Sequence, residues 1–205
     1  GNGMRLLITA FEPFGGETVN AAREAVLALP EKIGVWDVDK LEVPTVFSAA
    51  GDTVVQALER LRPDAVLCVG QAAGRAAVTP ERVAINCMDA RMADNAGDCP
   101  EEEPVVAGGP AAYFSTIPVK RLVGAVQAAG IPAAVSNTAG TFVCNALYYC
   151  VLHFAAQRQP RLRACFLHVP ATPEQAGEGM PSMPTAEAAC ALEAAILAIL
   201  PEEIQ

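Results

Sequence analysis

The sequence predicts an α/β fold, namely a three-layer α/β/α sandwich around a largely parallel mixed sheet. Short apolar runs typical of buried strands alternate along the chain with segments whose apolar residues follow helical spacing. Short loops join these segments, as in the β-α-β units of parallel sheets. With 205 residues, 52% of them hydrophobic, and a mean hydropathy of +0.30, the chain is long and apolar enough to bury a substantial core.

The N-terminal part begins with an apolar strand over Arg5–Ala10, which leads into a glycine loop. Asn20–Leu29 has helical apolar spacing and stops at Pro30, and Val35–Val43 is the next strand. The remaining elements, in order, are a helix over Thr53–Leu61, a strand over Ala65–Val69, a strand over Glu81–Cys87 with an excursion to Gly97, a helix over Pro118–Ala129, a strand over Ala133–Asn137, a helix over Thr141–Gln157, a strand over Cys165–Val169, the loop Ala171–Pro184 and a closing helix over Thr185–Leu200.

The segment between Arg121 and Arg158 contains no charged residue and includes Pro132, which excludes one continuous membrane-spanning helix. We therefore expect this segment to form a buried strand and helix of a globular core. No linker composition or internal repeat divides the chain, so we expect one domain over residues 4–205. Residues 1–3, which precede Met4, resemble a cloning remnant and are set aside.

The composition excludes several classes of partner. A net charge of −9 provides no basic surface for nucleic acid or an anionic membrane. Seven cysteines have no zinc-ligand spacing and only two histidines accompany them, so we expect no metal and no other cofactor. Two glycine loops lack the Lys-Ser/Thr of a phosphate-binding loop, which disfavours a nucleotide- or phosphate-handling enzyme. Free thiols without a secretory signal predict a cytoplasmic protein.

One β-α-β unit places a thiol and an imidazole at the same edge of the predicted sheet. Cys144 falls in the first turn of the Thr141–Gln157 helix, and His168 falls at the carboxyl end of the following strand. The N-terminus of a helix favours a thiolate and offers N–H groups to an oxyanion, so a Cys–His pair is expected. A third group that orients the imidazole is Glu81, Asp89 or Asp94, and spacing does not choose among them.

The chain also resembles the pyroglutamyl peptidase I family, in blocks that span nearly its whole length in the family's order. The blocks are Phe11-Glu12-Pro13-Phe14-Gly15-Gly16, Val69-Gly70-Gln71-Ala72-Ala73-Gly74-Arg75, Pro80-Glu81-Arg82-Val83-Ala84-Ile85-Asn86, Asp89-Ala90-Arg91 with Asp94-Asn95, Ser136-Asn137-Thr138-Ala139-Gly140-Thr141-Phe142-Val143-Cys144-Asn145, and His168-Val169-Pro170 with Glu174-Gln175. The resemblance implies an α/β/α cysteine exopeptidase that releases N-terminal pyroglutamate (5-oxoproline) from peptides through an acyl-enzyme intermediate.

The resemblance also implies a role for individual residues. Cys144 matches the nucleophile, His168 the histidine and Glu81 the third member, while Arg91 matches a rim residue associated with the oxyanion. The positions that match the lactam pocket are Phe11, Phe14, Thr45, Met92, Phe142 and Val143, together with Gln71, whose backbone meets the lactam ring, and Asn20, which helps to hold the pocket loop.

The chain departs from the family at Met92-Ala93, where Ile-Pro is usual, and at Ala73, where a glycine is usual. Methionine is flexible and apolar, so the pocket wall is expected to survive beside a looser loop. The alternative is a non-catalytic homologue that binds pyroglutamyl peptides, and the retained trio argues against it. The resemblance and the high apolar content together predict a homodimer or homotetramer.

Overall fold

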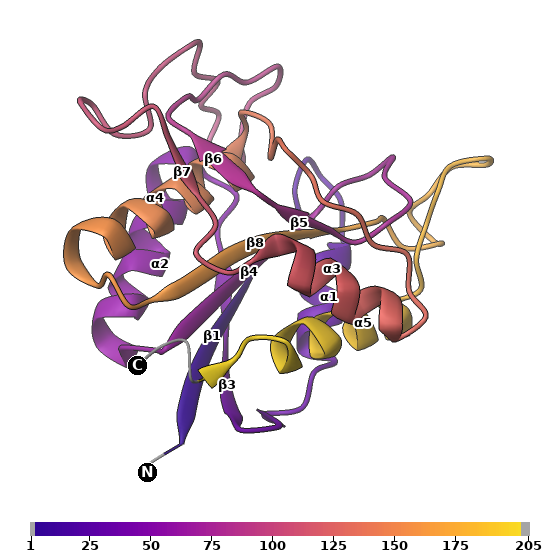
Figure 1. The fold of residues 1–205 in the computed structure, drawn as a ribbon. Helices are drawn as coiled ribbons and strands as arrows, with labels where there is room; N and C mark the ends of the chain where they lie inside the picture. The colour runs from indigo at the N-terminus through magenta and orange to yellow at the C-terminus, as the bar shows by residue number, and fades with distance from the viewer. Residues whose placement is uncertain (1–2, 202–205) are drawn as a thin grey trace.

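The computed structural model describes residues 3–201, which are built around a six-stranded sheet with the strand order β2-β3-β1-β4-β8-β5 (Figure 1). Strands β3, β1, β4 and β8 run parallel, whereas β2 and β5 pair antiparallel at the two edges. The strands span Lys32–Ile33 (β2), Trp36–Val43 (β3), Met4–Phe11 (β1), Ala65–Gln71 (β4), Arg163–Val169 (β8) and Thr79–Glu81 (β5). Residues 202–205 of the expected domain lie outside the described residues.

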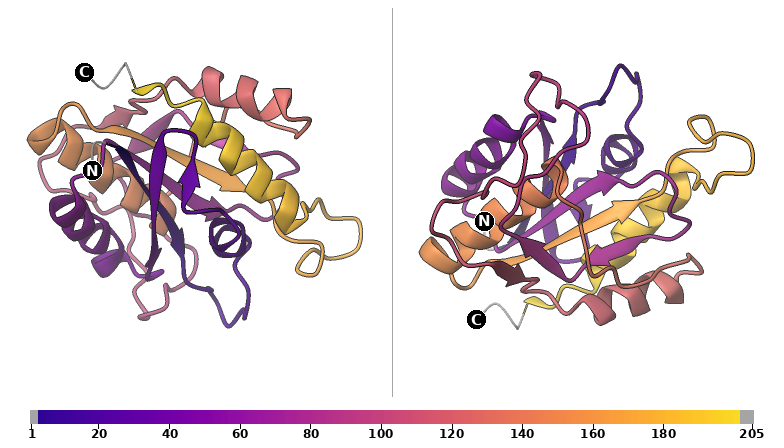
Figure 2. Two further views of the ribbon diagram at one scale, coloured as in Figure 1. Left: turned by 90° about the horizontal axis from the view of Figure 1, so that it is seen from below. Right: turned by 90° about the horizontal axis from the view of Figure 1, so that it is seen from above.

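Helices cover both faces of this sheet (Figures 1 and 2). One face carries α2 (Phe47–Leu61) and α4 (Val143–Arg158), and the other carries α1 (Ala21–Leu27), α3 (Val119–Ala128) and α5 (Thr185–Leu197). Successive strand residues point to opposite faces. Leu6 and Ile8 therefore pack with α1, α3 and α5, whereas Leu7 packs with α2 and α4. The predicted three-layer α/β/α class is confirmed.

The charge-free segment forms the inner helix α4, as its composition predicts. Its buried residues lie on nearly all sides of the helix and include Leu147, Tyr148 and Leu152. Tyr148 keeps its hydroxyl satisfied by donating to the carbonyl of Glu81 at 2.9 Å. Between residues 3 and 201, no helix is both long and apolar enough to cross a membrane.

The expected strand Ala133–Asn137 is wrong, because this segment forms only isolated bridges beside β5, at Ala133 and Ser136. Val78 donates to Pro132 and accepts from Ala134, as in a parallel ladder. The next rung needs an N–H on Pro80, which proline lacks, so the ladder breaks there. Ser136 N–H still donates to the Pro80 carbonyl at 3.0 Å.

The expected strand Glu81–Cys87 is also divided. β5 ends at Glu81, and β6 (Val83–Ile85) pairs antiparallel with β7 (Ala112–Phe114) in a separate two-stranded sheet. The N–H of Arg82, between the two strands, donates to the carbonyl of Ser136 at 2.9 Å. Glu81 is thereby the last residue of the expected Glu81–Cys87 strand that belongs to the main sheet.

A crevice is expected where the order of parallel strands reverses direction. The chain passes from β1 to β3 on one side and then returns to form β4 on the other side of β1. Phe11 ends β1 and Gln71 ends β4, so both lie at this switch point. The loop from residue 170 to 184 follows β8 at the same edge and extends away from the body of the domain before α5 (Figure 2).

Candidate active site

Cys144 lies at the second position of α4, directly above the end of β4. The residue before the helix, Phe142, offers no side-chain hydrogen bond to the first turn. The first N–H groups of a helix have no partner within the helix, so those around Cys144 are candidates to bind a ligand beside its sulfur. A Cβ atom at Gly70 would lie 3.0 Å from the Cys144 sulfur and 2.8 Å from Phe166, so this close approach requires glycine.

Gly70 also pairs with His168 in the register of β4 and β8. The Cys144 sulfur and His168 therefore both neighbour one backbone position, Gly70.

The start of α4 is held in place by Asn145, which sequence reasoning missed. Its buried side chain accepts from the N–H of Ile85 at 3.0 Å and donates to the carbonyls of Ile85 at 2.9 Å and Cys87 at 3.2 Å. These bonds tie the turn that carries Cys144 to β6. The residue follows Cys144 directly, but nothing local shows that its partners lie about sixty residues earlier in the chain.

His168 contacts one carboxylate. Its Nδ1 lies 3.1 Å from Oε1 of Glu81, and both side chains are buried. The antiparallel pairing of β5 with β8 sets this contact, because Thr79 lies opposite His168 and Glu81 lies two residues further on. Arg75, a residue to which the sequence assigned no role, donates from Nη1 to the same Oε1 at 2.8 Å.

The protonation states follow from these contacts. Burial alone would raise the pKa of Glu81, but polar contacts with His168, Ser136 and Arg75 bring it below its usual value. Burial lowers the pKa of His168; Glu81 opposes this shift, and the charge of Arg75 adds to it. At neutral pH the site therefore holds a carboxylate and a neutral imidazole. Nδ1–H donates to Glu81, which leaves Nε2 as the proton acceptor.

Burial opposes the thiolate that the helix N-terminus is expected to favour at Cys144. Burial raises the pKa of the Cys144 thiol to about 12, and the charge of Glu81 adds to the rise while Arg75 opposes it. The resting pair is consequently a thiol and a neutral imidazole. Attack on a carbonyl then requires His168 to take the proton as the sulfur reacts.

The other two acids that the sequence left open do not reach the imidazole. Asp94 is buried, and its carboxylate accepts from the N–H of Phe47 at 2.8 Å, which caps α2 from outside the helix. It also accepts from the N–H groups of Ala96 and Asp98, which closes its own loop. Asp89 is exposed, and its main chain pairs with Thr141.

A cavity of about 290 Å³ opens beside Cys144. Its lining includes seven of the residues expected in the lactam pocket: Phe11, Phe14, Asn20, Thr45, Gln71, Met92 and Phe142. The rings of Phe14 and Phe142 meet edge to face with centroids 5.2 Å apart. Glu17 is an additional lining residue at the exposed side.

Two of the expected residues lie elsewhere. Val143 does not line the cavity, because its side chain is buried in the core beneath α4. Arg91 is exposed and is also absent from the lining.

The polar side chains of this cavity are committed to holding its walls. Asn20 caps α1 by accepting from the N–H of Arg23 at 3.1 Å. The Thr45 hydroxyl donates to the carbonyl of Glu12 at 3.1 Å. The Gln71 side-chain oxygen accepts from the N–H of Ala21 at 2.7 Å. A ligand therefore meets aromatic faces, Met92 and main-chain groups, with the Glu17 carboxylate at the exposed side.

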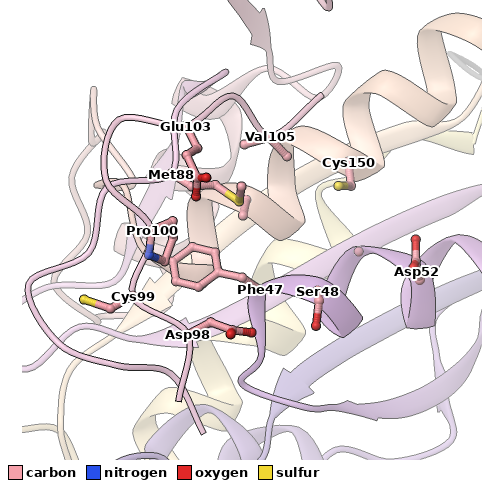
Figure 3. Close-up of a pocket in the computed structure, with 12 residues that line it drawn as sticks. Phe47, Ser48, Asp52, Met88, Asp98, Cys99, Pro100, Glu103, Val105 and Cys150 are labelled. Carbon is pink, nitrogen blue, oxygen red and sulfur yellow. The ribbon is translucent and has the colours of Figure 1, made fainter. Parts of the chain in front are cut away.

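A second cavity of about 530 Å³ is lined by Phe47 at the start of α2 (Figure 3). The Phe47 ring also packs edge to face against Phe142, which lines the first cavity. The second cavity contains Cys99 and Cys150 but neither histidine of the chain. No Cys–His pair therefore lines it. Among residues 3–201, no group of three or more His, Cys, Asp or Glu side chains is arranged to hold a metal ion.

Comparisons with known proteins agree on one family. Residues 4–202 match the family described as Pyroglutamyl peptidase. A pyrrolidone-carboxylate peptidase of Levilactobacillus brevis is 50% identical over 199 residues, which cover 96% of this chain and 98% of that protein. One from Streptococcus pyogenes is 49% identical over 199 residues, covering 96% and 93%.

Solved structures are equally similar. The crystal structure of pyroglutamyl peptidase I from Bacillus amyloliquefaciens has a TM-score of 0.94 at 41% identity, covering 98% of this chain and 97% of that one. A mutant pyrrolidone carboxyl peptidase from the hyperthermophile Pyrococcus furiosus has a TM-score of 0.92 at 40% identity, covering 97% and 99%.

Proposed function

The chain belongs to the pyroglutamyl peptidase family, and we propose that it releases N-terminal pyroglutamate from peptides by means of Cys144, His168 and Glu81. The observation that carries this proposal is the buried His168–Glu81 pair beside Cys144, at the mouth of a mostly apolar cavity. A non-catalytic binding role is not favoured, because the relatives are peptidases and the chain keeps the complete trio. We treat residues 4–205 as one peptidase domain.

In the first step, Nε2 of neutral His168 takes the proton of the Cys144 thiol as the sulfur attacks the carbonyl carbon of the pyroglutamyl residue. Glu81 stabilises the imidazolium that forms. The carbonyl oxygen becomes an oxyanion, which we assign to the first N–H groups of α4 rather than to Arg91, since Arg91 does not line the cavity. The C–N bond then breaks, and the imidazolium gives its proton to the leaving amine.

The second step hydrolyses the thioester that remains on Cys144. His168 takes a proton from water as the oxygen attacks the same carbonyl carbon. The C–S bond breaks, the sulfur recovers a proton from the imidazolium, and pyroglutamate leaves as a free acid. Every proton passes through one imidazole, so no metal or other cofactor enters the scheme.

The cavity suits a neutral lactam better than an ammonium group. Pyroglutamate carries one N–H and one C=O in its ring, and we propose that main-chain groups at Gln71 bond them. An N-terminal proline or glutamine would bring a charged nitrogen against Phe14 and Phe142, which costs several kcal/mol when the charge is unpaired. Sites that bond such groups also reject analogues lacking them.

We expect kcat/KM for a pyroglutamyl anilide to exceed that of the prolyl and glutaminyl anilides by at least about 10³-fold. Release of the aniline chromophore measures this directly. Glu17→Gln is the matched control, because Glu17 is the one carboxylate along the cavity lining. It should leave the ratio unchanged. Comparable cleavage of the prolyl anilide would contradict the lactam pocket.

We also propose a homodimer or homotetramer in the cytoplasm. Phe114 on β7 is 68% exposed, and Met180 on the projecting 170–184 loop is 52% exposed, so apolar surface remains available for a second copy. All seven cysteines are free, which suits a reducing compartment and can be checked by cell fractionation. Light scattering at micromolar concentration should give a multiple of 21.3 kDa, and the monomer mass would contradict the assembly.

A further inference from the structure

Arg75 lies between the buried carboxylate of the site and solvent. It sits in the turn after β4, where its N–H donates to the carbonyl of Ala72 at 3.2 Å. Its side chain is 32% exposed, whereas that of Glu81 is fully buried, and their ion pair is 2.8 Å long. The guanidinium therefore reaches inward from the surface to a charge that has no access to water.

The guanidinium holds three parts of the site at once. Nη1 donates to Glu81 Oε1 and to the Thr79 hydroxyl, each at 2.8 Å. Nη2 donates to the carbonyl of Thr138 at 3.1 Å, in the segment that leads to the nucleophile helix. Thr79 lies opposite His168 in the sheet, so Arg75 joins the acid, the strand beside the imidazole and the approach to Cys144.

The charges require such a partner. A buried carboxylate without compensation is costly, and His168 is neutral in the resting site, so it does not supply a positive charge. Arg75 is the one permanently charged group with an ion pair to Glu81 among residues 3–201. Both Arg75 and His168 bond the same oxygen, Oε1, so the arginine also fixes which edge of the carboxylate faces the imidazole.

Building on the proposed function, we propose that Arg75 is a positioning residue for the hydrolysis. It keeps Glu81 ionised and aimed at His168, and its own positive charge disfavours a second positive charge on the imidazole before the Cys144 proton arrives. It does not line the cavity beside Cys144, so its effect passes through Glu81 rather than through contact with substrate.

The groups that face His168 determine the pH dependence. Glu81 from β5 and Arg75 from the turn after β4 are the charged groups that act on His168. The Cys144 thiol on α4 is in turn influenced by Glu81, Arg75 and Cys68 of β4. Loss of the positive charge at Arg75 makes the Glu81–His168 pair bind a proton at higher pH. Because activity needs the unprotonated imidazole, the acid limb of the pH profile of kcat/KM must move to higher pH.

The test compares Arg75→Ala and Arg75→Lys with the parent on a pyroglutamyl anilide across pH. For Arg75→Ala we expect kcat to fall by about 10- to 100-fold with little change in KM, since mispositioned groups lose rate. The acid limb should move up by about one pH unit, the scale of one nearby charge. Arg75→Lys should restore the limb but only part of kcat, because an ammonium lacks the fork that joins three partners.

Arg82→Ala is the matched control, because it removes one positive charge next to Glu81 in the chain from an arginine that bonds Asn137 instead. It should keep the parent's kcat and pH profile. In a Glu81→Gln background, Arg75→Ala should add little further loss, because the two changes remove one linked interaction.

Three results overturn the inference. In the first, Arg75→Ala matches Arg82→Ala in rate and acid limb, and in the second its loss of rate is undiminished in the Glu81→Gln background. If Arg75→Ala does not fold by circular dichroism, Arg75→Lys decides, and a parental kcat in that variant contradicts the role of the fork. A parent chain that fails to cleave the pyroglutamyl anilide refutes the proposed function instead, so the two failures are distinguishable.

Discussion

Cys144→Ala is expected to abolish release of pyroglutamate, with kcat falling on the order of 10⁵-fold or more, the scale seen when a protease loses its nucleophile. The reason is that no other thiol lines the cavity or lies against Gly70. Alanine keeps the helix propensity of α4 and removes only a sulfur, so the fold should persist. Chromophore release from the pyroglutamyl anilide measures the rate, and a thermal melt checks the fold.

Cys150→Ala is the matched control for this loss. Cys150 lies on the same helix, but it faces the second cavity and packs against Gly51 of α2. No histidine lines that cavity, so the Cys150 thiol lacks an imidazole base and is a packing group. It should keep parental turnover. An inactive Cys150→Ala beside an active Cys144→Ala would move the nucleophile to the other cavity.

His168→Ala is expected to lower kcat/KM by at least about 10⁴-fold, because both proton transfers pass through this imidazole and the Cys144 thiol does not ionise unaided. Burial also lowers the pKa of His168. The acid limb of the parent's kcat/KM against pH is therefore expected below the ordinary histidine value of about 6.5. As pH falls through that limb, His168 gains a proton and ceases to act as the base.

His153→Ala is the control, since the chain contains only two histidines. Its Nδ1 lies 2.7 Å from the Tyr113 hydroxyl and its ring stacks on Tyr149, in the far half of α4. Its loss should reduce the melting temperature without changing kcat. Equal rates for His168→Ala and the parent would remove the base from the scheme.

The sequence prediction of Cys144 and His168 depends on a local rule. A strand end and a helix start in neighbouring segments must share one edge of a parallel sheet. The premise fails here, because the Ala133–Ser136 segment runs parallel to β5 and β5 is antiparallel to β8. Cys144 reaches the level of His168 because α4 starts against Gly70, which pairs with His168. Pro80 is visible in the sequence, but its effect on the hydrogen-bond ladder with the Ala133–Asn137 segment depends on which segment lies opposite it in the fold.

The choice of Glu81 over Asp94 depends on contacts between distant segments. Glu81 reaches His168 only because β5 pairs antiparallel with β8, a register that spacing along the chain does not contain. Asp94 instead caps α2 at Phe47, which also explains why the helix begins before the expected Thr53. The resemblance to known peptidases selected Glu81, and the geometry supplies the physical reason.

Arg75 and the protonation of Cys144 needed the structure for a different reason. The pKa of a thiol at a helix N-terminus depends on the balance between the helix dipole and burial, and burial is a three-dimensional quantity. For Cys144 the effect of burial is the larger one, so the resting sulfur is a protonated thiol. The same burial of Glu81 makes Arg75 necessary, although nothing around Gly74 in the sequence indicates an ion pair.

Trapping of the acyl-enzyme tests the central claim most directly. Rapid mixing with a pyroglutamyl anilide, an acid quench and mass spectrometry of proteolytic peptides should find a pyroglutamyl thioester on the peptide that contains Cys144. The same peptide from Cys144→Ala should carry none, and its quench should show no burst of chromophore. A pyroglutamyl adduct on a different cysteine, or turnover in which Cys144 is never acylated, would contradict the account.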